Sequence, residues 1–399
     1  MKRSRKVEKR IKGNREGISK RDFLRISIAG LGTAVAGLPT SRIFAKNFSA
    51  MEPSTTVIPG GLGKYSKESP YYIITPKGVR CQICPNQCTL TEGLESICRT
   101  RTVYNNKLFT IAYGNPCSMH IDPIEKKPLF HFLPAAKSFS IATAGCTLSC
   151  MNCQNWEISQ KSPKETQNYE LFPPDVVEEA AKNGCKTIAF TYSEPTAFYE
   201  YMFDTAKLAK ARGIKTLLIS NGYINAKPLR DLAKYIDAAN INLKSFREEI
   251  YATLNGGSLQ PILNTLKILK EEGVWLEITN LIVPTWTDKM DMIAEMCDWL
   301  VKNGFADTPL HFSRFFPLYK LTSLPYTPEA TLEKAYHIAE KAGIKYIYIG
   351  NVPGTPHENT ICPSCKKVVL ERRGFYIAAN NLKSGNCKFC GTKIAGVWN

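Results

Sequence analysis

Cysteine is the residue type whose spacing in this sequence points most directly to chemistry. The chain has 14 cysteines in 399 residues, and eleven of them fall into three short groups. Such a long chain with so few cysteines is not a disulfide scaffold, whereas cysteines two or three residues apart can aim their sulfur atoms at one metal centre. Cys117, Cys185 and Cys297 stand alone, and we expect them to pack in the core.

The central group reads CxxxCxxC and directly follows residues 138–145, which we predict to form a strand. Its members are Cys146, Cys150 and Cys153. Three thiolates in one loop can hold three irons of a [4Fe–4S] cluster and leave the fourth iron open to a small ligand. The alternative is a zinc site that takes its fourth ligand from elsewhere, such as Cys117 or His120.

The C-terminal group contains two CxxC pairs separated by 21 residues, a spacing typical of a zinc ribbon. Its members are Cys362, Cys365, Cys387 and Cys390. We predict a structural metal site, with zinc as the expected ion, because two such turns close one tetrahedral site. A rubredoxin-like iron site has the same spacing, and four reduced thiols without metal are the remaining alternative.

The N-terminal group places four cysteines within 18 residues. Its members are Cys81, Cys84, Cys88 and Cys98. Such a set can bind zinc, or it can bind an auxiliary [4Fe–4S] cluster that passes electrons or holds substrate. Spacing alone does not decide between zinc and a cluster, and from the sequence we favour structural zinc.

Seven apolar runs with predicted strand character alternate with helical patterns through the middle of the chain. The predicted strands are residues 138–145, 186–193, 215–222, 238–243, 274–283, 309–317 and 345–351. The predicted helices are residues 174–183, 197–212, 259–272, 290–303 and 328–342. This alternation predicts an α/β fold of successive βα units on a parallel sheet. Six or seven units are too few for a closed eight-stranded barrel, so we predict a partial TIM barrel of the (β/α)6 type, with working residues at the strand ends.

The three-cysteine motif and the strand that follows it resemble the radical S-adenosylmethionine superfamily. Residues 192–195 read Tyr-Ser-Glu-Pro, where that superfamily has a Gly-Gly-Glu-Pro motif that receives the methionyl amino group. The resemblance therefore implies this role for Glu194, although two glycines are replaced. An aromatic residue usually precedes the last cluster cysteine; this chain has Asn152 there, and Trp156 is expected to compensate.

Two further strand ends carry residues that the same resemblance assigns to the cofactor. Asn221, after the third strand, is implied to contact the methionine or ribose part, although Asn-Gly is also a common turn. Lys244, after the fourth strand, is implied to pair with the carboxylate, although a surface role is the alternative. His311 and Arg314 end the sixth predicted strand, and we propose them as candidate substrate contacts; a structural role is the alternative for the histidine.

Several longer strings resemble one subfamily, the radical enzyme of AmmeMemoRadiSam systems, close to pyruvate formate-lyase activating enzymes. These strings are residues 122–134, 153–160, 191–201, 311–320 and 346–354. The resemblance covers about residues 70 to 399. It implies a Memo-like protein and an AmmeMemo-domain protein as partners, and a flavodoxin or ferredoxin as electron donor. It leaves the substrate open.

The net charge of +17 is concentrated at the two ends of the chain. Residues 1–25 carry +8 and residues 362–399 carry +6, so the body is nearly neutral, which argues against a nucleic-acid enzyme. Residues 19–25 resemble a twin-arginine signal, and residues 26–38 are uncharged and too short to span a membrane. We expect an export leader, with a disordered basic tail as the alternative. A leader favours export or membrane association, whereas the cofactors favour the cytoplasmic side.

These observations divide the chain into four parts. They are a leader (1–45), a Cys-rich domain (46–137), a radical S-adenosylmethionine core (138–355) and a zinc-ribbon-like module (356–399). We expect reductive cleavage of S-adenosylmethionine at a [4Fe–4S] cluster, giving a 5′-deoxyadenosyl radical that abstracts hydrogen from a substrate, for which a protein is one candidate. The competing hypothesis is an iron–sulfur electron-transfer or scaffold protein that does not cleave S-adenosylmethionine.

Overall fold

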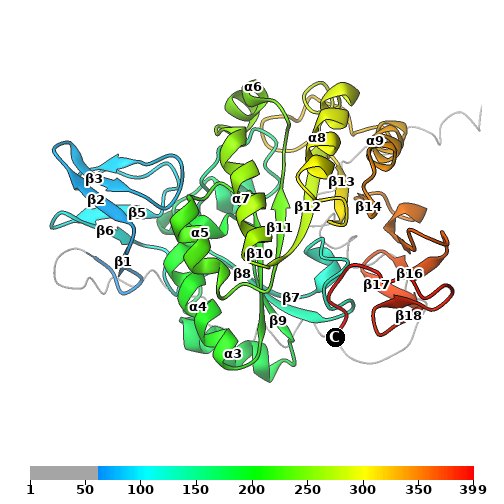
Figure 1. The fold of residues 1–399 in the computed structure, drawn as a ribbon. Helices are drawn as coiled ribbons and strands as arrows, with labels where there is room; N and C mark the ends of the chain where they lie inside the picture. Colours follow the sequence, from blue (N-terminus) through cyan, green and yellow to red (C-terminus); the bar gives the residue numbers. More distant parts are fainter. Residues whose placement is uncertain (1–61) are drawn as a thin grey trace, which may run out of the picture. The chain divides into compact units, whose positions relative to one another are not determined.

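An eight-stranded sheet forms the centre of the computed structural model, which describes residues 62–399 (Figure 1). In spatial order its strands are β14 (Ile347–Gly350), β13 (Leu310–Arg314), β12 (Trp275–Ile282), β11 (Ala238–Asn242), β10 (Lys215–Ser220), β9 (Thr187–Phe190), β8 (Lys137–Ala142) and β7 (Ser118–Pro123). Strands β8 to β14 run parallel, each beside the next in sequence, whereas β7 is antiparallel to β8. The predicted parallel α/β sheet is confirmed, and its seven parallel strands fall within or overlap the seven predicted ranges.

Helices follow the strands and pack on the sheet (Figure 1). The longer ones are α3 (Pro173–Lys182), α4 (Tyr199–Ala211), α5 (Ala226–Ala233), α7 (Leu259–Glu271), α8 (Met290–Lys302) and α9 (Glu329–Ala342). Two short ones are α2 (Trp156–Ser159) and α6 (Glu248–Ile250). Each long helix buries one face, as α7 does with Ile262, Leu266 and Leu269, because its apolar residues recur every three or four positions. In the described part of the chain no helix is long and apolar enough to cross a membrane. The expected leader, residues 1–45, lies outside the described residues.

The connection between β7 and β8 closes the amino-terminal end of the sheet's inner face. We call residues 124–136 the floor segment; its apolar side chains include Leu129 and Phe132. These pack with Leu217 of β10 and Ala238 of β11, which lie in the first halves of their strands. The sequence analysis assigned β7 and the floor segment to the Cys-rich domain, yet β7 is hydrogen-bonded along its whole length to β8 of the central sheet.

Two small antiparallel sheets form the N-terminal module. One contains β1 (Lys67–Glu68), β6 (Lys107–Thr110) and β5 (Arg101–Tyr104), and the other contains β2 (Tyr72–Thr75), β3 (Gly78–Cys81) and β4 (Thr89–Leu90). A buried ion pair between Arg101 and Glu200 of α4, at 2.5 Å, joins this module to the core. A second link is the Asn225 amide N–H, which donates to the Ile83 carbonyl at 2.9 Å.

The C-terminal module is a small β structure that packs on the floor segment. Its strands are β15 (Thr360–Ile361), β16 (Val368–Arg373), β17 (Tyr376–Asn380), β18 (Leu382–Lys383) and β19 (Asn386–Cys387). The guanidinium of Arg372, only 2% exposed, donates to the Phe130 carbonyl at 2.7 Å and lies over the Phe130 ring. In addition, the Leu133 amide donates to the Val397 carbonyl, and the Val397 amide donates to the His131 carbonyl, each at 2.7 Å.

Candidate functional site

The three-cysteine loop begins where β8 ends, at the carboxyl edge of the parallel strands. Gly145 makes the turn into this loop with φ of +101°, a conformation that side chains other than glycine rarely adopt. All three cysteines are free thiols, and Cys150 is only 7% exposed. Parallel α/β folds assemble their active sites at this edge of the sheet, so the structure places the predicted cluster ligands where catalysis is expected.

A segment about a hundred residues further along the chain holds this loop in place. Asn255 ends a π-helical turn (Tyr251–Asn255); its side-chain amide donates to Cys150 Sγ at 3.3 Å and its carbonyl accepts from the Ser149 amide at 2.9 Å. Gly256 and Gly257 follow it and lie so close that a Cβ atom would come within 2.2 Å of Ser149 Oγ or 2.5 Å of Leu148 Cδ2. This support was not predicted from the sequence, although the Asn-Gly-Gly string indicates a turn at this point.

Glu194 is buried directly beside the loop. It follows β9, and its side chain is 2% exposed. One carboxylate oxygen accepts from the Thr196 amide at 3.0 Å and from Ser220 Oγ at 2.7 Å, and the other accepts from the Asn221 amide at 2.8 Å. Burial raises the pKa of Glu194 above its usual value, and these hydrogen bonds oppose that shift.

Asn221 connects this carboxylate to the first cysteine. Its side-chain amide lies 3.1 Å from Thr147 Oγ1 and 3.7 Å from Cys146 Sγ, so it points at the loop as well as holding Glu194 through its backbone. The structure therefore brings Cys146, Glu194 and Asn221 together, three residues whose association the sequence resemblance implied. An Asn-Gly turn, which was the alternative for Asn221, does not by itself require this side chain to face a sulfur atom.

The departure from the usual glycines at residues 192 and 193 has a structural explanation. Tyr192 adopts φ of +63°, the left-handed region that glycine favours. Its hydroxyl donates to Asp122 of β7, and Asp122 forms a buried ion pair with Lys127 at 2.5 Å. The Ser193 hydroxyl donates to the Thr143 carbonyl at 2.7 Å. A strained residue held by a buried polar group is a recurrent feature of functional sites.

The thiols of the loop are suited to bind metal rather than to act as free nucleophiles. Burial raises the pKa of Cys146 well above its usual value, and the Glu194 carboxylate raises it further. Burial and the neighbouring Cys150 raise the pKa of Cys153 to about 11, while the charge of Lys244 acts in the opposite direction. Thiolate ligation here requires a positive centre, which a metal cluster supplies.

Two buried oxygen atoms at the loop support the same assignment. Asn152 Oδ1 and Asn255 Oδ1 accept no hydrogen bond from any described residue. A buried acceptor without a donor costs about 1–3 kcal/mol, and such groups are retained where a ligand satisfies them. Asn152 precedes the last cysteine of the motif. Three thiols, an unpaired acceptor and a buried carboxylate together fit an iron–sulfur cluster with an amino-acid-bearing ligand.

Trp156 and Arg314 have other partners in the structure. Trp156 begins α2 and stacks on Tyr319, with ring centroids 5.3 Å apart. Arg314 donates to the Thr327 carbonyl at 2.8 Å and pairs with Glu329 at the start of α9 at 3.2 Å. These contacts join the segments that follow the cysteine loop and β13 to their neighbours.

His311 lies deeper than the sequence analysis expected. It is the second residue of β13 rather than its end, and it is 4% exposed. Its Nε2 is 2.7 Å from a carboxylate oxygen of Glu277, a fully buried residue of β12 that sequence reasoning missed. Glu277 also accepts from the Phe130 and His131 amides of the floor segment. The structure therefore places His311 inside β13 rather than at the strand end where it was expected, and there it contacts Glu277, which holds the floor segment.

The C-terminal cysteines converge on one small volume. All four sulfur atoms, from Cys362, Cys365, Cys387 and Cys390, lie within 4.8 Å of one another. Two of the Sγ–Sγ distances are 3.7 Å. Among residues 62–399 this is the one group of three or more potential metal ligands so close together. Among the described residues, the three cysteines of the loop do not form such a group with Cys117 or His120.

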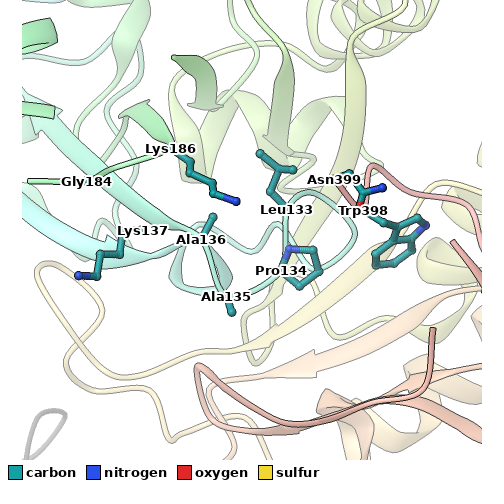
Figure 2. Close-up of a pocket in the computed structure, with 9 residues that line it drawn as sticks. All are labelled: Leu133, Pro134, Ala135, Ala136, Lys137, Gly184, Lys186, Trp398 and Asn399. Atoms are coloured by element: carbon teal, nitrogen blue, oxygen red, sulfur yellow. The ribbon is translucent and has the colours of Figure 1, made fainter. Parts of the chain in front are cut away.

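A cavity of about 510 Å³ lies elsewhere on the molecule (Figure 2). Its lining includes Lys137, which begins β8, and Lys186, which precedes β9, together with Trp398 and Asn399. It is therefore at the amino ends of these strands, opposite to the cysteine loop. None of the predicted site residues lines it, and we assign it no chemistry.

Comparison with known proteins agrees with this geometry. The family model described as the radical SAM superfamily matches residues 140–300. The uncharacterized protein MJ0808 of Methanocaldococcus jannaschii is 45% identical over 318 residues, covering 79% of this chain and 95% of that protein. Pyruvate formate-lyase 1-activating enzyme of Escherichia coli (strain K12) is 24% identical over 220 residues, covering 51% of this chain and 89% of the enzyme. Among solved structures, Streptococcus suis SuiB bound to S-adenosylmethionine matches with a TM-score of 0.43 and 16% identity, covering 57% of this chain and 53% of that chain.

Proposed function

This chain belongs to the radical SAM superfamily, in the same family as MJ0808, and on that premise we propose that it cleaves S-adenosylmethionine reductively to start radical chemistry on a substrate. Cys146, Cys150 and Cys153 would hold the cluster. When bound, a [4Fe–4S] cluster supplies the electron that splits S-adenosylmethionine into methionine and a 5′-deoxyadenosyl radical. The protein's own residues position the two cofactors and keep water away from them.

The observation that carries this proposal is the junction of Glu194, Asn221 and Cys146. The carboxylate is 2% exposed and is held by hydrogen bonds without a cation among the described residues, and the ammonium group of a bound S-adenosylmethionine would supply one. Asn221 binds that carboxylate through its backbone amide, and its side-chain amide lies 3.7 Å from the sulfur of the first cysteine. A protein that only carries electrons does not need a buried carboxylate beside its cluster, so the arrangement favours cleavage over the electron-transfer alternative.

The experiment is an anaerobic turnover assay. Purified chain, S-adenosylmethionine and dithionite are incubated, and 5′-deoxyadenosine is measured by chromatography. We expect product from the unaltered protein and none from Cys150→Ala, which also loses the iron of this loop. Cys185→Ala is the matched control, because Cys185 is a lone, 4% exposed thiol. A Cys150→Ala protein that still makes 5′-deoxyadenosine would overturn the assignment, and an iron-loaded parent that makes none would favour electron transfer.

For the C-terminal cysteines we propose zinc. A tetrahedral site with zinc–sulfur bonds of about 2.3 Å separates its sulfur atoms by about 3.8 Å. The two measured separations of 3.7 Å support that size. The site would be structural, because the four cysteines fill all four ligand positions of the ion and leave none for a substrate. Three of these thiols are buried or half-buried, and only Cys390 is exposed.

The partners and location are proposals that rest on the sequence resemblance. We propose that a Memo-like and an AmmeMemo-domain protein act with this chain, and that a flavodoxin or ferredoxin reduces it. We propose that residues 1–45 direct the chain to the membrane while the cofactor-dependent reaction stays on the cytoplasmic side. Fractionation of cells that carry the full chain with a C-terminal reporter tests the location.

A further inference from the structure

The four cysteines of the N-terminal module lie directly against the three-cysteine loop. Asn86, between Cys84 and Cys88 in sequence, donates its side-chain amide to the Thr147 carbonyl at 2.7 Å. The Cys98 carbonyl packs on Gly145 so closely that a Cβ atom there would meet it at 2.5 Å. Thr147 and Gly145 flank Cys146. The middle of the N-terminal group, at Asn86, and its last cysteine therefore both contact the segment that carries the first ligand of the active-site cluster.

Three of these four cysteines are buried, and the fourth, Cys88, is half-buried. Cys81, Cys84 and Cys98 are 5%, 7% and 7% exposed. The Cys81 amide donates to the Cys88 carbonyl at 3.0 Å, which places the first and third cysteines side by side. Four cysteines this close in sequence, three of them buried, match the composition of a metal centre.

The separation of the sulfur atoms indicates the size of that centre. The C-terminal thiols all lie within 4.8 Å of one another, as a single tetrahedral ion requires. Within residues 62–399, no three thiols of the N-terminal group are that close, and neither are the three thiols of the active-site loop. Several irons in one cluster hold their thiolates further apart than one ion does. The N-terminal group thus follows the pattern of the active-site loop rather than that of the C-terminal module.

We propose that Cys81, Cys84, Cys88 and Cys98 bind a second iron–sulfur cluster that passes electrons to the active-site cluster. This reverses our preference for zinc from the sequence. The relay part of the proposal rests on the proposed function. One electron enters from a reduced one-electron carrier protein, moves to the active-site loop and is consumed when the carbon–sulfur bond of S-adenosylmethionine breaks. No atom or proton is transferred at the second cluster.

Metal analysis of anaerobically purified full chain tests the site without using activity. With two [4Fe–4S] clusters and one zinc, we expect about eight irons and about one zinc per chain. Cys150→Ala is expected to keep about four irons and a reduced-state electron paramagnetic resonance signal, since only the active-site cluster is lost. About four irons and two zincs in the parent, or no iron in Cys150→Ala, would overturn the second cluster. This variant leaves the N-terminal module intact, so the test does not depend on folding of a module variant.

A comparison of two reductants tests the relay. In Cys84→Ser we expect 5′-deoxyadenosine formation driven by reduced flavodoxin to fall at least tenfold more than formation driven by dithionite, which reaches the active-site cluster directly. Cys185→Ala is the matched control and is expected to show equal ratios for both reductants. Equal losses with both reductants would overturn the relay. If the parent makes no 5′-deoxyadenosine but Cys150→Ala retains about four irons, the proposed function fails while the second cluster stands.

Discussion

At the scale of single residues, Glu194 and Asn255 show two ways in which one side chain can be tied to the cluster loop. Glu194 was predictable, because its place before a proline at a strand end matches a motif. Asn255 was not, because its contact with Cys150 joins residues a hundred positions apart and depends on the π-helical turn before it. Local sequence identifies the first kind of residue. For the second, the Asn-Gly-Gly string indicates a turn, and only tertiary packing shows which loop that turn supports.

The charge of Glu194 is testable by Glu194→Gln. Glutamine offers one acceptor oxygen where glutamate offers two, so an NH₂ group faces either the Asn221 amide or the Ser220 and Thr196 donors. Loss of a charge-assisted hydrogen bond of about 2 kcal/mol predicts a KM for S-adenosylmethionine raised about thirtyfold. Steady-state kinetics measure it, and the iron content is the control, expected to be unchanged. An unaltered KM would remove Glu194 from the cofactor site.

The contact of Gly256 with the loop is testable by Gly256→Ala. Its φ of +70° resembles the +69° of Gly213, but a Cβ at Gly256 meets Ser149 Oγ at 2.2 Å, whereas at Gly213 it meets nothing within 4 Å. Both substitutions carry the same left-handed cost of about 1 kcal/mol. We therefore expect only Gly256→Ala to lose iron from the active-site loop, by at least half, as measured by colorimetric iron analysis. Equal iron in the two variants would contradict this support role.

At the scale of elements, the parallel strands were predictable and the segment that closes them was not. Strands β8 to β14 are apolar runs bounded by turns, so their pattern is strong. In β7 the sequence Ser-Met-His-Ile-Asp-Pro has mixed burial, and it becomes a strand only because β8 offers it a partner. The floor segment has no regular pattern of apolar residues. The role of these residues is clear only in the structure, where they pack against Leu217 and Ala238. This explains why His311 was expected at a strand end with the other site residues. Its contact with Glu277 could not be predicted without the position of the floor segment.

The zinc proposed for the C-terminal module is expected to stabilise it, because a module this small has little apolar core of its own. We expect a zinc chelator, or Cys365→Ser, to release about one zinc per chain and to make the module about tenfold more sensitive to trypsin. Its Lys366, Lys367 and Arg373 provide cleavage sites. Limited proteolysis followed by mass spectrometry measures this. Cys297→Ala, at a fully buried lone thiol of α8, is the control, and unchanged proteolysis of the zinc-free protein would contradict a structural role for the metal.

At the scale of the whole molecule, a few buried polar contacts join the outer modules to the core. The Arg101–Glu200 pair joins the N-terminal module to α4. On the other side, His131 of the floor segment bridges to the C-terminal module: Nδ1 lies 2.6 Å from the Ala395 carbonyl and Nε2 lies 2.5 Å from the Tyr348 hydroxyl. Because a carbonyl only accepts, Nδ1 carries a proton. Burial lowers the pKa of the ring, so His131 is neutral near pH 7 and Nε2 accepts from the tyrosine.

This bridge predicts a pH dependence of stability. Burial lowers the pKa of His131 to about 4, despite the opposing charge of Glu277. Between that value and the unfolded value of about 6.5, the unfolded state binds more protons, so stability falls as pH falls through this window. From pH 7.5 to 5.5 we expect a loss of about 1 kcal/mol by urea unfolding under anaerobic conditions. His131→Asn should reduce the slope, while His337→Gln, at an exposed histidine of α9, should keep it; equal slopes in all three proteins would contradict the prediction.

The packing around the three-cysteine loop has a consequence for how the holoprotein matures. Gly145 lies against the Cys98 carbonyl, and Ser149 and Leu148 lie against Gly256 and Gly257. Cys146 and Cys153 nevertheless stay partly exposed, and Ser149 is exposed. Inorganic iron and sulfide would therefore reach the loop from this open side, so metallation would not require the N-terminal module to undock. The same opening would leave the oxygen-sensitive centre within reach of solvent until a cofactor or substrate covers it.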